Sequence, residues 1–172
     1  MKTYTSILYF LTDLSSAVRI NDLRVPEIFE LGASDSILLD CDFDYEDAEK
    51  FQLDIKWYFN GEPTPFVQWV PAQMERPQLI GDRFRGHVDL AHAVHEDVFK
   101  RHRALRLVHP TLELAGTYTC KVSTFLDEDV KQKKMVIYCE YIFSEFRSYV
   151  RFPGLRSFVL LRNWGMKFSF LV

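Results

Sequence analysis

Four histidines in the middle of the chain have a spacing that first suggests metal chemistry. They are His87, His92, His95 and His102. On a helix, positions three apart share a face, so His92 and His95, with Glu96 beside them, would resemble part of a metal site. A zinc site needs three or four ligands, but no third ligand has motif spacing and the HExxH motif is absent. We therefore expect polar loop histidines and no bound metal.

Motifs for nucleophilic and nucleotide chemistry are also missing from the sequence. It contains no Gly-x-Ser-x-Gly elbow, no P-loop and no dinucleotide fingerprint. Cys139 has no identifiable base that would activate it as a nucleophile. We expect Cys139 to be an unpaired thiol, with an intermolecular disulfide as the alternative. The sequence therefore predicts a protein that is not an enzyme and needs no cofactor.

The composition is that of a folded domain and not of a disordered chain. Of the 172 residues, 48% are hydrophobic and 15% are aromatic, which suits one domain with extensions or at most two very small ones. The formal charge of −3 argues against a dedicated nucleic-acid binder, which normally carries a basic excess. This charge is unevenly distributed, because residues 140–172 are basic.

Three cysteines fit one long-range disulfide and one leftover thiol. A structural disulfide implies an oxidising compartment, so the N-terminus should carry an export signal. Lys2, the apolar run at 7–11 and the small residues at 15–17 predict a signal peptide over residues 1–17. The alternative is a disordered or strand-forming end. No run reaches the length of about 20 apolar residues that spans a bilayer, so we expect no transmembrane segment.

Alternation of apolar and polar residues predicts a series of short strands. These runs lie at residues 37–43, 54–59, 66–70, 105–107, 117–123 and 134–138. Asn60 and Gly61 favour a tight hairpin turn after the second run. Residues 89–103 are ambiguous and could hold a short helical turn. Many short strands with no strong amphipathic helix between them predict an all-β sandwich.

Two cysteines, a tryptophan and a tyrosine occupy inward-facing positions of these predicted strands. Trp57 follows Cys41 by 16 residues, and Cys120 follows Cys41 by 79. Tyr118 lies two residues before Cys120. Each of these residues alone would fit an ordinary core, and only their combination is specific.

This combination resembles an immunoglobulin V-set domain over roughly residues 19–138. The likeness is carried by the segments 55–58 and 105–120. The wide spacing of the cysteines leaves room for two extra strands, which favours the V-type over the constant type. Within the superfamily, Lys56-Trp57-Tyr58, the run ending Trp69-Val70-Pro71 and the segment 118–123 look most like the first domain of insect beaten-path-type neuronal recognition proteins.

The resemblance implies a disulfide between Cys41 and Cys120, which would cross the gap between two facing sheets. Trp57 would pack against its sulfur atoms. The Tyr118 hydroxyl would bond back to the backbone in a tyrosine corner. We therefore expect these four residues to form the centre of the core.

One position departs from the family pattern. Leu114 stands where the family usually carries an aspartate that pairs with an arginine on a neighbouring strand. Arg83 or Arg85 would then lack its usual partner, unless Glu113 replaces it.

In V-type domains the outer face of one sheet usually contacts the partner. By strand parity, the partner-binding residues that we predict on this face are Lys56, Tyr58, Trp69, Lys121 and Ser123. Val67 is expected beside Trp69. Tyrosine and tryptophan supply interface energy at little entropic cost, and the two lysines would attract an acidic partner. The acidic loop at residues 126–129 is an alternative contact surface.

The resemblance implies an extracellular recognition module, secreted or cell-surface-associated, that acts in cell adhesion or neuronal partner recognition. Its partner would be a protein, and we expect another cell-surface immunoglobulin-type receptor. The alternative is a secreted immune-type or ligand-binding immunoglobulin protein with no adhesion role.

Residues 139–172 differ in character from the rest of the chain, because aromatic residues alternate there with arginines. Three interpretations compete: an amphipathic surface-binding tail, the start of a second domain, or sequence unrelated to the normal gene product. We favour the third, since a second immunoglobulin domain would need far more chain. We expect a non-domain tail that packs poorly on the sandwich.

Overall fold

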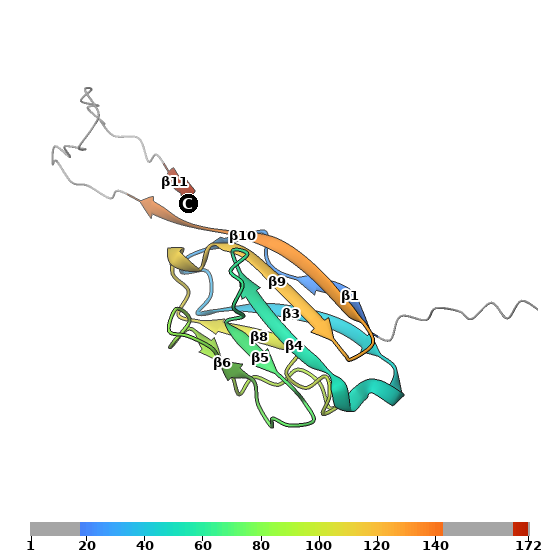
Figure 1. Ribbon diagram of the computed structural model, residues 1–172. Coiled ribbons are helices and arrows are strands. Elements are labelled where there is room, and N and C mark those ends of the chain that lie inside the picture. The colour runs from blue at the N-terminus through green and yellow to red at the C-terminus, as the bar shows by residue number, and fades with distance from the viewer. Residues whose placement is uncertain (1–17, 143–166, 172) are drawn as a thin grey trace, which may run out of the picture.

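Two facing β-sheets form the body of the protein (Figure 1), and the computed structural model describes residues 18–142 and 167–171. The smaller sheet contains β1 (Val18–Arg24), β3 (Ser36–Tyr45), β7 (Val88–Asp89) and β8 (Ala104–Val108). The larger sheet contains β2 (Ile28–Glu30), β4 (Asp54–Phe59), β5 (Val67–Trp69), β6 (Gln78–Leu79), β9 (Gly116–Ser123), β10 (Glu128–Ile142) and β11 (Lys167–Leu171). The predicted all-β sandwich is confirmed.

The order of the strands is β1-β3-β8-β7 in the smaller sheet and β11-β10-β9-β4-β5-β6 in the larger one. The short strand β2 pairs in parallel with β10, so the N-terminal part of the chain contributes a strand to each sheet. Two short 3-10 helices, η1 (Asp47–Gln52) and η2 (Leu112–Leu114), connect strands. In the part of the chain that the structure describes, no helix is long and apolar enough to cross a membrane.

Alternating side chains explain why these segments form half-buried strands. In β4, Ile55, Trp57 and Phe59 are buried, whereas the residues between them are partly exposed. Strands of this pattern bury one face against a partner sheet.

The turn after β4 has the backbone that Asn-Gly favours. Asn60 and Gly61 have φ values of 50° and 71°, and the Glu62 N–H bonds to the Phe59 carbonyl at 3.0 Å. The Asn60 side chain also accepts the Thr117 N–H at 2.8 Å. Gly116 must be small, because a Cβ there would lie 2.5 Å from the Asn60 side chain and from the Phe59 ring. The connection to β5 nevertheless runs on to residue 66, so it is longer than a tight hairpin.

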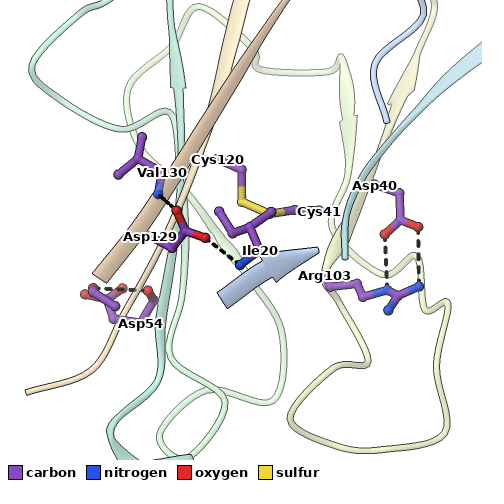
Figure 2. Close-up of a disulfide and its surroundings, with 9 residues drawn as sticks. Ile20, Asp40, Cys41, Asp54, Arg103, Cys120, Asp129 and Val130 are labelled. Carbon is purple, nitrogen blue, oxygen red and sulfur yellow. Dashed lines mark hydrogen bonds and ion pairs between the residues drawn. A yellow bond between two sulfur atoms is a disulfide. The ribbon is translucent and has the colours of Figure 1, made fainter. Parts of the chain in front are cut away.

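The disulfide joins the two sheets through the core (Figure 2). Cys41 on β3 and Cys120 on β9 are bonded, which confirms the predicted pair. Trp57 pairs with Cys120 in the β4–β9 register, so their side chains lie side by side on the inner face. Tyr118 is buried with them, and burial raises the pKa of its hydroxyl.

A carboxylate at the sheet edge links the first strand to the tenth (Figure 2). Asp129 accepts the Val130 N–H at 2.8 Å and the Ile20 N–H at 2.7 Å with its two oxygens. Asp129 therefore satisfies a backbone donor of β1 beside a register shift in the β1–β3 ladder.

Residues 90–103, which we call the β7–β8 segment, form turns and bends and no helix. The Tyr45 hydroxyl donates to Asp97 at 2.8 Å, and Lys100 pairs with Asp44 at 2.7 Å. The segment is thus held by side-chain contacts to the end of β3. The short helical turn considered for it forms only as single hydrogen-bonded turns, such as those at 97–100 and 100–103, and not as a helix.

The last long strand extends past residue 138, where the alternation predicted its end. β10 continues to Ile142 because β11 provides backbone partners, from Tyr138 opposite Leu171 to Ile142 opposite Lys167. The remainder of the predicted tail, residues 143–166 and 172, lies outside the described residues. So does the predicted signal peptide over residues 1–17.

Candidate protein-binding face

The outer face of the larger sheet is built from rows of paired residues. In the β4–β9 register, Asp54 lies opposite Ser123, Lys56 opposite Lys121, and Tyr58 opposite Thr119. β10 extends the same rows with Glu128, Val130 and Gln132. Cross-strand partners point to the same side of a sheet, so these residues form one surface, which we call the outer face. Four predicted contact residues, Lys56, Tyr58, Lys121 and Ser123, lie on it.

Trp69 does not lie on this face, and its prediction as a contact residue is wrong. Its side chain is only 2% exposed, its indole N–H donates to the Met74 carbonyl at 3.2 Å, and its ring meets His102 edge-on at 5.3 Å. Val67 is buried as well. Both residues point into the core, and Gln68 between them takes the outward position. The single glutamine in this apolar run was the sequence feature that could have indicated which side chain of β5 points outward.

Ion pairs within the outer face neutralise its lysines. Lys56 Nζ lies 2.6 Å from Asp54, which also accepts two hydrogen bonds from the Gln68 amide at 3.0 and 3.1 Å. Lys121 Nζ lies 2.5 Å from Glu128, and this hydrogen bond raises the pKa of Lys121. The lysines therefore form two mixed-charge pairs beside Tyr58 instead of a free basic patch.

Three of the four histidines that suggested a metal site, His87, His95 and His102, contact the backbone of the loops through a ring nitrogen. His87 Nδ1 lies 3.0 Å from the His109 carbonyl, and His102 Nδ1 lies 2.6 Å from the His92 carbonyl. Within the described residues, no three His, Cys, Asp or Glu side chains gather as they would around a metal ion.

No protein-family model matches the sequence, and no curated protein matches it. Solved structures do match. The human B7-H4 IgV-like domain aligns with a TM-score of 0.47 at 20% identity, covering 69% of this chain and 93% of that domain. Murine CRIg aligns with a TM-score of 0.46 at 15% identity, covering 69% of this chain and 96% of that one.

The N-terminal eight Ig domains of Down Syndrome Cell Adhesion Molecule (DSCAM) align with a TM-score of 0.50 at 16% identity. The alignment covers 74% of this chain but 13% of that chain, so our chain spans a small part of it. The strand order agrees with this match, because β5 and β6 extend the sheet of β10, β9 and β4, and the disulfide joins β9 to β3. The domain has the immunoglobulin V-type fold.

A tyrosine corner of the immunoglobulin type is present. The Tyr118 hydroxyl donates to the Leu114 carbonyl at 2.7 Å, four residues upstream. Leu114 itself is buried in the core, where the immunoglobulin pattern would place an aspartate. Arg83 instead pairs with Glu62 at 2.8 Å and lies over the Phe59 ring. Glu62 therefore takes the place of the missing aspartate as the partner of Arg83, and Glu113 remains exposed.

The loop between β9 and β10, strands F and G of the immunoglobulin fold, carries an apolar tip beside its predicted acidic residues. Phe125 and Leu126 at its tip are 86% and 82% exposed. Sequence reasoning missed this apolar tip because the acidic residues at 127–129 dominate the local composition. Two adjacent large apolar residues inside a turn were the available signal.

Proposed function

We propose that this protein is an extracellular recognition module that binds another protein through the outer face around Tyr58. The observation that carries the proposal is the position of Tyr58, an aromatic side chain set among polar and paired residues of that face. Tyrosine joins a large apolar ring to a hydroxyl and loses little entropy on binding, so it is enriched at the energetic centres of interfaces.

The surroundings of Tyr58 indicate what surface would fit it. The Lys56–Asp54 and Lys121–Glu128 pairs present both charges and nearly cancel. A complementary partner would offer an apolar recess for the ring and a mixed polar border, and it need not be acidic. Charge pairs at such a border set register and specificity more than affinity.

The disulfide supports export, because such bonds persist in oxidising compartments and are rare in the cytosol. A role in cell adhesion or neuronal partner recognition, with another cell-surface immunoglobulin-type receptor as the partner, rests on the sequence resemblance to insect beaten-path-type proteins. The fold alone hosts many binding functions.

A binding screen tests this proposal. The full chain, multimerised to capture weak contacts, would be measured against a panel of purified receptor ectodomains and, in parallel, against soluble ligands and microbial surfaces. We expect at least one ectodomain to bind and Tyr58→Ala to abolish that signal. Binding of soluble ligands or microbial surfaces alone would overturn the adhesion role in favour of a secreted immune-type protein.

A further inference from the structure

A small hollow lies between the β4–β5 connection and the β6–β7 connection. Its volume is about 240 Å³, and it is lined by residues 62 and 64–66 of the first connection and residues 80–84 of the second. The first connection leaves β4 at Phe59, whereas η1 and the β9–β10 turn adjoin the other end of β4, where Asp54 pairs with Ser123. The hollow therefore lies at the end of the sandwich away from η1 and the β9–β10 turn.

Apolar residues form one part of the lining. The rings of Phe66 and Phe84 stack with their centroids 4.0 Å apart, and both residues are buried in the core. Pro65 and Ile80, which are half-buried, line the hollow as well. The Ile80 N–H bonds to the Phe66 carbonyl at 2.8 Å and so ties the two connections together. An apolar side chain of a ligand would thus enter a preformed recess.

The charged part of the lining is centred on Arg83. Its guanidinium carbon lies 4.7 Å from the centre of the Phe59 ring, and its Nη1 donates to Glu62 at 2.8 Å. Among the described residues, Glu62 is the only acceptor of this guanidinium, which carries five N–H donors. Arg83 is therefore held in place by an aromatic ring and still has donors to offer a ligand.

The pair of Arg83 and Glu62 is open to exchange. The two side chains are 52% and 49% exposed, and exposed ion pairs contribute little to stability. The other acidic residue of the lining, Asp82, is already neutralised, because it pairs with Arg85 at 2.5 Å. An incoming carboxylate can therefore share the guanidinium with Glu62 or displace it.

We propose that the hollow binds the C-terminal residue of a polypeptide, where this residue has an aliphatic or aromatic side chain. The side chain would occupy the recess beside Phe66 and Ile80, and the terminal carboxylate would accept a bidentate pair of hydrogen bonds from Arg83. In a C-terminal residue both groups are attached to the same Cα, so one residue satisfies both parts of the lining. This site is separate from the outer face around Tyr58 and does not rest on the function proposed for that face.

The size of the hollow favours one anchored residue over a whole small molecule. Pockets that enclose drug-sized ligands measure roughly 300–1,000 Å³, and this hollow is smaller. The rest of the polypeptide would continue past the exposed residues Thr64 and Gly81. A Cβ on Gly81 would meet open space, so this side of the hollow has room for a chain that leaves it.

A lysine or arginine side chain fits the lining less well. Its cation would meet the like charge of Arg83, and both carboxylates of the lining, on Glu62 and Asp82, already have arginine partners. The two classes of ligand also respond in opposite ways to the loss of the Glu62 charge. This loss should favour the binding of a carboxylate and disfavour the binding of a cation.

Calorimetric titration of the full-length protein with the peptide acetyl-Gly-Gly-Gly-Leu tests the proposal. We expect the free acid to bind roughly 10-fold more tightly than the same peptide with a C-terminal amide. Arg83→Met should weaken binding of the acid roughly 10-fold. Glu62→Gln should instead strengthen it roughly two- to fivefold, because Arg83 loses its competing partner. In NMR spectra, the acid should shift the backbone amide signals of residues 64–66 and 80–84.

Two further variants separate the site from a general loss of charge and from misfolding. Arg76→Met removes the same charge from an exposed position outside the lining and should leave the affinity for the acid within about twofold. Arg83→Lys keeps the charge but loses the planar fork, and should weaken the acid roughly threefold. All of these variants should keep a melting temperature close to that of the wild type, because the substituted side chains are exposed.

Four results would overturn the proposal. They are the absence of binding by the acid at millimolar concentration, equal affinities for the acid and the amide, wild-type affinity in the Arg83→Met protein, and weaker binding of the acid by the Glu62→Gln protein. Acetyl-leucine, a single residue, is the last comparison. If it bound as tightly as the tetrapeptide, the assignment to a polypeptide would be wrong and the occupant would be a small carboxylic acid.

Discussion

Arg103 Nε lies 3.1 Å from Asp40 Oδ1, and both side chains are largely buried on the outer side of the smaller sheet (Figure 2). Arg24 approaches the other Asp40 oxygen at 3.3 Å. Two residues further along β3, Asp42 also pairs with Arg103, so one guanidinium spans two outward carboxylates of the strand. These pairs fasten the β7–β8 segment to the sandwich at its C-terminal end.

Arg103→Met should therefore destabilise the domain. Among the described residues, it leaves the largely buried Asp40 with only the solvent-exposed Arg24 as a cationic partner and removes the cation of Asp42, and removing one partner of a buried ion pair is costly. We expect a loss of roughly 2–4 kcal/mol in the free energy of unfolding, measured by urea denaturation. The control is Arg106→Met, whose exposed pair with Asp89 at 4.0 Å should contribute less than about 1 kcal/mol. Equal losses in the two variants would contradict this assignment.

Tyr118→Phe tests the tyrosine corner. The substitution keeps the ring and removes only the hydroxyl, which leaves the Leu114 carbonyl without that donor in the core. A buried polar group that loses its partner costs about 1–3 kcal/mol, and we expect a loss of this size by denaturation. Tyr58→Phe on the outer face should change stability by less than about 0.5 kcal/mol. The assignment fails if Tyr118→Phe is as stable as the wild type.

Removal of the disulfide should have the largest effect on folding. Replacing Cys41 and Cys120 by alanine releases a constraint across 79 residues, and loops of this length are worth about 4–5 kcal/mol in the chain-entropy model. Cys139→Ser, which changes the free thiol, should leave stability close to wild type. Unfolding curves for the oxidised protein would show the difference, and a double variant with wild-type stability would exclude the proposed contribution.

The central core could be predicted because long strands fix the parity of their residues. β3, β4 and β9 are each long enough to show several alternations, so the inward positions of Cys41, Trp57, Tyr118 and Cys120 followed directly. A one-residue error in such a strand would expose its entire apolar side, and the pattern excludes it.

The outer face was only partly predictable, because β5 has three residues. Its neighbours on both sides are apolar, so alternation did not decide whether Trp69 pointed in or out. The Trp69 indole donates to the partly buried Met74 carbonyl, and no local sequence pattern indicates this hydrogen bond. In the same way, the path of the β7–β8 segment depends on ion pairs such as Arg103 with Asp40, whose members are far apart in sequence.

Acid should weaken the contact between β3 and the β7–β8 segment. A hydrogen bond from Lys100 lowers the pKa of Asp44. Burial opposes ionisation of Asp97, but bonds from the Phe99 N–H and the Tyr45 hydroxyl outweigh it and lower its pKa. A carboxyl group whose pKa is lower in the folded than in the unfolded state stabilises the fold at pH values above its unfolded pKa of about 4. This contribution is lost as the pH falls through the folded pKa.

Stability should therefore decline below about pH 4. The combined variant Asp44→Asn and Asp97→Asn should be less stable than wild type at neutral pH and should lose less on acidification. Denaturation between about pH 6 and about pH 3 would check this, and parallel curves for the two proteins would contradict the assignment.

The most direct test of the central claim is the affinity of Tyr58→Ala for an ectodomain found in the binding screen, measured beside Leu38→Ser by surface plasmon resonance. Leu38 is exposed on the opposite sheet, so its substitution controls for a general loss of surface apolarity. We predict that Tyr58→Ala weakens binding by roughly 30-fold or more, as for the aromatic centre of an interface, while Leu38→Ser binds as the wild type does. Unchanged affinity of the Tyr58→Ala protein would contradict the account.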